Sequence, residues 1–415
     1  MTNVEYQWQK HHTELLSYIA ANPSIVIEGD VVRIPGDVRE RFYSIFNRIR
    51  QSFVEENYAP QLAMGKALSN AWAEIIASTE QTGFGPVDIS ANVNCFMLNP
   101  LDGLMRQLLG PANSLLRRKI DILGFEQQGH KEVSEAFESY YRLGYMYWVQ
   151  LALIKALQID KNYRVPVIDS STEVAMGEGH ETPGFHVDNV PELEERAKVS
   201  FIQHPTVSFM TSQVIVHSTK LKGLVGLCSD FVEPHWSSCG ANNSLEWFDL
   251  PALLKEHKID KPRPDYRDYI KFNRIMSDVL VYTTNNTNNI KLVADHYRFL
   301  RPDLCLEVMA QSDWYEKGKL EIVKKHHSVM QPRRGTYVIC LEQPPQAAID
   351  ELMPKSQNVK DSTGAMDGST QQADAAGAEL SSSERVEQVC DIHLVHVGLD
   401  ASKLGTIVDA MSSKQ

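Results

Sequence analysis

The chain has 415 residues, of which 43% are hydrophobic and 23% charged, and a formal net charge of −12. This composition is typical of folded proteins and excludes a wholly disordered chain, and the length predicts two or three domains. The acidic balance argues against a protein that coats nucleic acid, because such a protein needs an extended basic surface. The longest apolar run, 145–154, has about half of the roughly 20 residues that a bilayer requires, so we expect no membrane partner.

The cysteines and the first residues bear on location. Six cysteines are widely spread and include no C-x-x-C pair. This spacing favours reduced thiols over a disulfide framework or a zinc ribbon. The beginning of the chain, MTNVEYQWQKHH, lacks the apolar core of a secretory signal. We therefore expect a cytoplasmic protein.

Helical periodicity dominates the N-terminal part. Residues 1–36 hold a short amphipathic stretch followed by an edge strand over 24–34. Apolar residues at helical spacing then predict helices over 37–56, 60–78, 101–109, 113–123 and, as the longest, 131–157. We interpret 37–160 as a helical domain.

The hydrophobic period changes from residue 163 onward. Two or three consecutive strands over 200–235, broken by a turn at 218–223, are expected to form the centre of a sheet. Around this hairpin the pattern predicts strands at 165–169, 335–342 and 390–397 and helices at 243–256, 265–281, 290–299, 320–327 and 404–411.

This order of elements predicts the α/β class, with α+β as the alternative. A helical N-terminal domain precedes a mixed-sheet α/β core over 161–342. The run 343–388 is poor in aromatic residues and carries eight acidic against three basic residues, so we expect a disordered insertion. Ordered patterns resume over 389–415, where a strand and a helix are expected to complete the α/β domain.

A polar loop at 173–188 combines carboxylates with imidazoles. His180, His186 and Asp188 are candidate metal ligands there, because imidazole and carboxylate together suit a divalent metal. The alternative is a solvated loop that binds no metal.

A second polar cluster follows the predicted hairpin. Asp230 and Glu233 come directly after a strand, with His235 close by. Acids at a strand end suit metal or acid–base chemistry. The alternative is a strand that leaves the core and becomes polar.

Basic residues gather in two runs, 258–274 and 317–334, with aromatic residues among them. Such mixtures suit phosphate contact and base stacking, and solvated helix faces are the alternative. The candidate nucleic-acid-binding residues are Lys271, Arg274, Lys317, Lys324, Lys325, Arg333 and Arg334.

The order long helix, strand, strand pair, helix, strand over 130–282 resembles the PD-(D/E)xK, or restriction-endonuclease-like, superfamily. In that superfamily a helix glutamate, an aspartate on the second strand and Glu-x-Lys on the third strand hold one or two Mg²⁺ ions that activate water for phosphodiester hydrolysis. The resemblance implies a helix at 131–157, carrying Glu135 or Glu138, and second and third strands at 213–217 and 223–231.

The signature residues differ at these positions. Ser212-Gln213 stands where the superfamily has Pro-Asp, and Cys228-Ser229-Asp230 stands where it has Glu-x-Lys. Either the chemistry has moved to other carboxylates or the domain binds without cutting. The carboxylates available for such a move are Asp169, Asp188, Asp230 and Glu233.

The resulting hypothesis is a nuclease-like protein that contacts nucleic acid, either as a divergent Mg²⁺-dependent phosphodiester hydrolase or as an inactive relative. The alternative is a non-catalytic scaffold that binds partner proteins through helical surfaces and the acidic insertion. A nuclease needs at least three acids that converge within reach of a metal, and both basic runs on one face.

Overall fold

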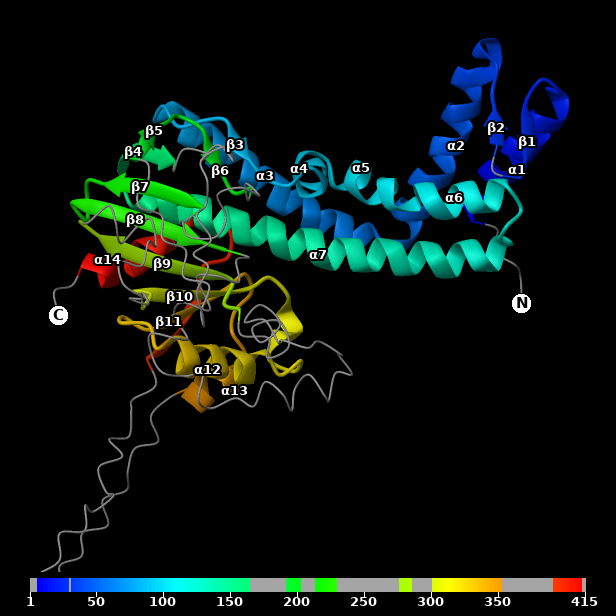
Figure 1. The fold of residues 1–415 in the computed structure, drawn as a ribbon. Coiled ribbons are helices and arrows are strands. Elements are labelled where there is room, and N and C mark those ends of the chain that lie inside the picture. Colours follow the sequence, from blue (N-terminus) through cyan, green and yellow to red (C-terminus); the bar gives the residue numbers. More distant parts are fainter. Residues whose placement is uncertain are drawn as a thin grey trace, which may run out of the picture.

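The computed structural model describes residues 6–29, 31–164, 192–202, 213–229, 276–285, 301–352 and 391–412. A helical arm, made by the N-terminal part of the chain, projects from a body built on a mixed sheet (Figure 1). The main sheet has eight strands. The predicted α/β class, with helices preceding a mixed sheet, is therefore confirmed.

The far end of the arm contains α1 (Gln7–Ala21), β1 (Val26–Glu28), β2 (Val31–Arg33) and the start of α2 (Gly36–Asn57) (Figure 1). The predicted edge strand over 24–34 is wrong, because β1 and β2 pair with each other as a two-stranded antiparallel sheet. Gly29 has φ +54°, in the left-handed region that glycine tolerates, and this breaks the segment into a hairpin.

The rest of the arm consists of helices that pack along one long helix. In chain order they are α3 (Ala59–Gln81), α4 (Ala91–Leu98), α5 (Pro100–Met105), the 3₁₀ turn η1 (Arg106–Leu108), α6 (Leu109–Leu116) and α7 (Ile122–Ala156). Helix α7 runs from the arm to the sheet (Figure 1).

Helix α7 begins at Ile122 rather than at Lys131 as predicted. The Asp121 side chain caps it by accepting a hydrogen bond from the Gly124 N–H at 2.8 Å. A methyl group at Gly129 would lie 2.9 Å from Cζ of Phe53, so glycine lets this first part of α7 approach α2 closely. The glycines and glutamines of 122–130 weaken the helical pattern in the sequence, which explains the late predicted start.

The main sheet has the order β12-β11-β10-β9-β8-β7-β4-β5. Its strands are β4 (Ile159–Arg164), β5 (Glu194–Glu195), β7 (Val214–Ser218), β8 (Gly223–Cys228), β9 (Val279–Thr284), β10 (Leu304–Met309), β11 (Thr336–Cys340) and β12 (Ile392–His396). Pairing is antiparallel from β5 to β10 and parallel through β10, β11 and β12. A separate short pair joins β3 (Val87–Asp88) to β6 (Val199–Ser200).

Both faces of the sheet are covered. Successive strand residues point to opposite faces, so Leu306 and Val308 join the large core that includes α7, whereas Met309 joins a second core beneath α12 (Lys319–Met330). Helix α12 makes the crossover between the parallel strands β10 and β11. The 3₁₀ turn η5 (Ala401–Leu404) and helix α14 (Gly405–Ser412) contact α7.

Several predicted elements of the α/β body are confirmed. Strands β7 and β8 form the expected hairpin, with Ser218 opposite Gly223 across the turn. Strands β11 and β12 and helices α12 and α14 also lie within or beside their predicted ranges, and β12 completes the sheet.

Two predictions for this body are wrong in part. The helix predicted over 265–281 overlaps β9, because the buried run that starts with Val279 is rich in residues that favour strands. The insertion predicted to be disordered over 343–388 contains helix α13 (Gln346–Leu352). The fully buried Ala348 and a hydrogen bond from Tyr315 Oη to Glu351 at 2.8 Å fix α13 to the body. Among the described residues, no helix is both long and apolar enough to cross a membrane.

Candidate active site at the carboxyl end of strand β10

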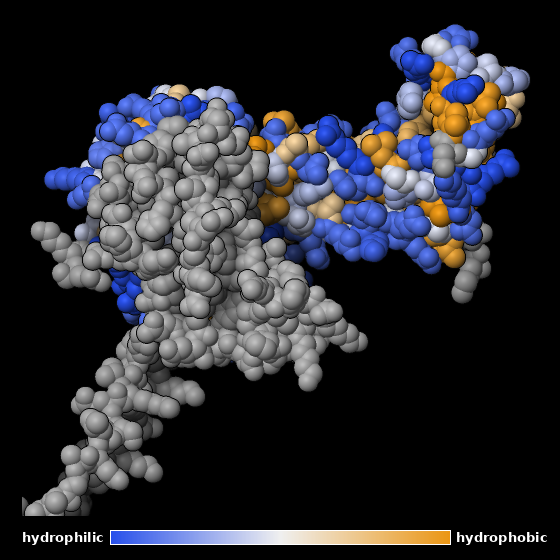
Figure 2. Space-filling view, in the orientation of Figure 1, coloured by the Kyte–Doolittle hydropathy of each residue, from blue (hydrophilic) through white to orange (hydrophobic). Residues whose placement is uncertain are grey.

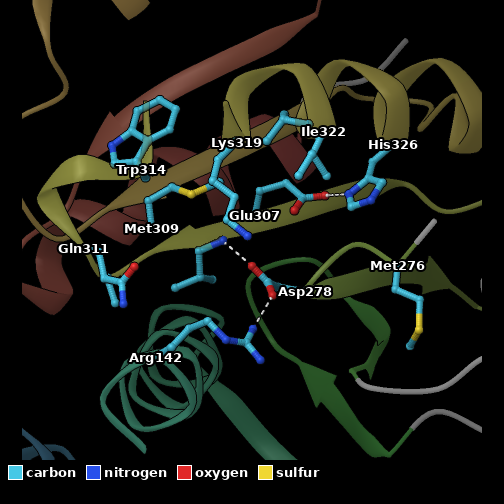
Figure 3. A pocket seen from close by; sticks show the side chains of 13 residues that line it. Arg142, Met276, Asp278, Glu307, Met309, Gln311, Trp314, Lys319, Ile322 and His326 are labelled. Atoms are coloured by element: carbon cyan, nitrogen blue, oxygen red, sulfur yellow. Dashed lines mark hydrogen bonds and ion pairs between the residues drawn. The ribbon is translucent and has the colours of Figure 1, made fainter. Parts of the chain in front are cut away.

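A cavity of about 410 Å³ lies where β10 ends, between α7 and α12 (Figure 3). In sheets with parallel strands, ligands commonly bind outside the carboxyl ends of those strands. Side chains that lie far apart in the sequence meet here. Those that carry chemistry are Arg142 of α7, Asp278 just before β9, Glu307 of β10, and Lys319 and His326 of α12.

Asp278 accepts hydrogen bonds from the Arg142 side chain and from the backbone of β10. Its Oδ1 accepts a bond from Nη1 of Arg142 at 2.9 Å, and its Oδ2 accepts one from the backbone N–H of Val308 at 2.7 Å. The aspartate side chain is 18% exposed and the arginine 45%. The β9–β10 pairing therefore fixes an acid that remains reachable from the cavity.

Glu307 is the second acid of the cavity. Its Oε1 lies 2.8 Å from Nδ1 of His326, and both side chains are almost fully buried, at 5% and 4% exposure. Since alternate residues of β10 share a face, Glu307 and Met309 both point toward α12. The imidazole holds the carboxylate in one orientation and satisfies a polar group that would otherwise be costly to bury.

Lys319 brings a second cationic group to the cavity, in addition to that of Arg142. Its side chain extends from the first turn of α12 into the space between the two acids (Figure 3). Within the described part of the chain it makes no hydrogen bond or ion pair. Nearby Lys317 differs, because a 2.9 Å ion pair with Asp313 engages it and raises the pKa of its ammonium group.

Apolar side chains form the rest of the wall. Trp314, in the 3₁₀ turn η4 (Ser312–Trp314), is 3% exposed, and Met309 is also buried. Ile322 of α12 lines the opposite side (Figure 3). Because Glu307 is buried beside these groups, its interactions are stronger than they would be in solvent.

The predicted catalytic and metal-ligating residues fall outside the described residues, as do two of the basic candidates, and they stay predictions. These residues are Asp169, His180, His186, Asp188, Asp230, Glu233, Lys271 and Arg274.

The other basic candidates lie on and around α12, and several of them have intramolecular partners. Lys324 bonds Glu321 at 2.9 Å and also Glu351, whose carboxylate raises the pKa of this lysine. Arg333 lies 3.8 Å from Asp303. Lys325 lies on the same helix, α12.

Arg334 has a different place from the other candidates. Its Nη1 donates to the carbonyl oxygens of Ala410 and Met411, at 2.9 and 2.5 Å, at the end of α14. Its guanidinium thus joins the C-terminal helix to the start of β11.

Sequence reasoning missed Arg142, Asp278 and Glu307, whereas Lys319 and His326 lie within the basic run 317–334. Glu307 did carry a signal, because it is the single acid inside the apolar run Leu304–Met309. Asp278 directly precedes a run of strand-forming residues. Arg142 carried none, and Lys319 carried only that of the basic run, because charged residues on helices are ordinary and the packing of α7 and α12 against the sheet brings them here.

The donors in the cavity suit a hard cation. Among the described residues, no group of three or more His, Cys, Asp or Glu side chains could hold a metal ion. The carboxylates of Asp278 and Glu307 do fit Mg²⁺, because this ion is often bound by one or two carboxylates, with waters and substrate phosphates as its further ligands.

No family model, curated protein or solved structure matches the chain.

Proposed function

We propose that this cavity is the active site of a divergent, Mg²⁺-dependent phosphodiester hydrolase of the nuclease-like type. The supporting observation is that Asp278, just before β9, and Glu307, of the adjacent strand β10, line one cavity with Lys319, whose ammonium group has no partner among the described residues. The proposal includes nucleic acid as the partner and the cytoplasm as the location.

The order of strands supports the proposal at a place different from the one that the sequence implied. Strand β8, the pair β9–β10, helix α12 and strand β11 follow the strand, strand pair, helix, strand order of the PD-(D/E)xK superfamily. In this alignment Ser277-Asp278 stands where the superfamily has Pro-Asp. Glu307-Val308-Met309 stands in place of Glu-x-Lys.

Lys319 supplies the cation that Met309 lacks. Both side chains line the cavity on the α12 side of the sheet. In the superfamily, the lysine on the strand stabilises the negative charge that develops on a phosphate. The ammonium group of Lys319, which reaches the cavity from the helix, can have the same role.

Each residue of the cavity has a role in this proposal. Asp278 and Glu307 would hold the ion, and the bound ion would activate water and neutralise phosphate charge. His326 orients Glu307 through the 2.8 Å contact. The buried wall around Trp314 limits the access of bulk water.

The direct test is cleavage of a mixed panel of DNA and RNA by the full chain with Mg²⁺ or Mn²⁺. Asp278→Asn and Glu307→Gln should each lower the cleavage rate at least about 100-fold. Asp313→Asn is the matched control, because this acid lies outside the cavity wall and pairs with Lys317. Full cleavage by both cavity variants, or a loss only in Asp230→Ala, would assign the chemistry to other residues.

One observation favours a second candidate, a protein that binds partner proteins through its arm. Apolar patches are visible on the arm (Figure 2). Leu123 is 59% exposed and Ile122 is 44% exposed at the far end of α7, beside a cavity of about 630 Å³. Under this candidate, Leu123→Asp abolishes cross-linking of the arm to partner proteins and Asp278→Asn does not.

A further inference from the structure

The contact between Arg142 and Asp278 joins the long helix of the arm to the acid at the start of β9. The aspartate is anchored from its other side, because Oδ2 accepts the Val308 N–H at 2.7 Å. The bond from Oδ1 to Nη1 of Arg142, at 2.9 Å, can therefore be exchanged without disturbing the β9–β10 pairing. The guanidinium of Arg142 therefore occupies a position at which the Asp278 carboxylate attracts a cation.

Arg142 retains most of its bonding capacity. Within the described residues, its one hydrogen bond is the bond to Asp278, whereas a guanidinium has five N–H donors. The side chain is 45% exposed, so it can turn toward the cavity at little cost. Its planar fork matches the oxygens of a phosphate.

Lys319 complements the arginine. The two side chains come from α7 and α12, which cover opposite faces of the sheet, and both line the same cavity (Figure 3). As noted above, Lys319 has no ion-pair partner among the described residues. Within the described residues, Arg142 and Lys319 both have unused N–H donors, and they lie on either side of the acids Asp278 and Glu307. Together the two cations can bind an oxyanion.

We propose that Arg142 exchanges partners, leaving Asp278 when that carboxylate holds the divalent ion and then binding, together with Lys319, a phosphate of the substrate. This proposal rests on the function proposed above and specifies how its substrate phosphate is held. Arg142 is both a competitor of the ion for Asp278 and a ligand of the phosphate.

A consequence is that the divalent ion and phosphate bind cooperatively. Phosphate draws Arg142 away from Asp278 and so raises the affinity of this acid for the ion. Because the coupling between two ligands is reciprocal, the ion raises the affinity for phosphate by the same factor. A pocket in which Arg142 merely stabilises the fold has no such coupling through this arginine.

The test is a titration of the full chain with Mn²⁺, followed by electron paramagnetic resonance, with and without inorganic phosphate. For the unaltered chain, phosphate should raise the Mn²⁺ affinity about fivefold or more. Arg142→Gln should bind Mn²⁺ about threefold more tightly without phosphate, because the competing cation is gone, and phosphate should no longer raise that affinity.

Two further variants complete the design. Arg41→Gln is the matched control, because it removes an exposed arginine from a 2.9 Å pair with Glu14 on the arm, and it should behave like the unaltered chain. Lys319→Gln should weaken the effect of phosphate and leave the affinity for Mn²⁺ alone within about twofold. Thermal unfolding curves check that every variant is folded, and Arg142→Met, which also removes the charge, replaces Arg142→Gln if that variant is not.

The outcomes separate this inference from the proposed hydrolase. Equal Mn²⁺ affinity in Arg142→Gln and the unaltered chain, an unchanged phosphate effect in that variant, or no Mn²⁺ binding to either protein overturns the exchange. If phosphate raises the Mn²⁺ affinity through Arg142 but the chain cleaves no nucleic acid, the result supports the partner exchange of Arg142 and rejects the proposed hydrolase activity. Cleavage that depends on Asp278, together with unchanged coupling in Arg142→Gln, supports the hydrolase and rejects the exchange.

Discussion

Glu307 on strand β10 and His326 on helix α12 face each other across 2.8 Å, with side chains that are 5% and 4% exposed. The contact ties the crossover helix to the strand at the centre of the candidate site. Removing one partner from a buried pair of this kind leaves the other partner without compensation, which costs more than removing both.

A single variant and a double variant test the structural role of this pair. His326→Leu should lower the free energy of unfolding by about 3 kcal/mol, because Glu307 stays buried without the imidazole. Glu307→Leu combined with His326→Leu should recover more than half of that loss, because two apolar groups can pack together. Urea unfolding of the three proteins measures this, and a double variant less stable than His326→Leu would contradict the expectation.

The same pair shows why the fold was more predictable than the site. Helical spacing predicted α2, α3 and α12, and the apolar pattern around the turn at Ser218 predicted β7 and β8, because each signal lies within one short segment. The contact between Glu307 and His326 requires the parallel crossover of α12 from β10 to β11. Local periodicity in the sequence does not predict which side chains of a strand and of its crossover helix will be in contact.

Polar clusters close together in the sequence were a poor guide for the described part of the chain. The basic run 317–334 looked like one nucleic-acid-binding surface, yet its members have separate partners. Lys324 bonds the acids of α12 and α13, and Arg334 bonds the end of α14. Lys319, a member of this run that was not among the candidate binding residues, is the lysine that lines the cavity.

Arg334 and its neighbour Arg333 give a matched pair of variants. Arg334→Gln should lower the free energy of unfolding by about 1–2 kcal/mol, because the last carbonyl groups of α14 lose a cationic donor. Arg333→Gln should cost less than about 1 kcal/mol, since this half-exposed side chain lies 3.8 Å from Asp303. Chemical denaturation compares the two, and a larger loss in Arg333→Gln would contradict the assigned roles.

Two glycines of the arm should respond in opposite directions to alanine. At Gly103 in α5, a methyl group would lie 2.7 Å from Cα of Phe96 in α4, so Gly103→Ala should destabilise the protein by about 1–3 kcal/mol through overpacking. At Gly110 in α6, such a group would have no atom within 4 Å, among those the structure describes. Gly110→Ala should therefore stabilise the protein by about 0.5–1 kcal/mol through better helix propensity. Thermal unfolding measures both, and equal effects would contradict the packing described for α4 and α5.

His327 predicts how stability depends on pH. Burial is the main cause that lowers the pKa of this imidazole, and nearby His393 and Arg301 lower it further, whereas Asp391 opposes them. Below about pH 6.5 the imidazole of His327 is therefore protonated more readily in the unfolded chain than in the folded chain. Its contribution to the free energy of unfolding is complete above that pH and is lost as the pH falls below it. His327→Gln should reduce the slope of unfolding free energy against pH by at most about 1.4 kcal/mol per pH unit between pH 6.5 and 5. Urea unfolding at intervals of half a pH unit measures both slopes. Parallel curves for the variant and the unaltered chain would show that this half-buried imidazole is not responsible for the loss.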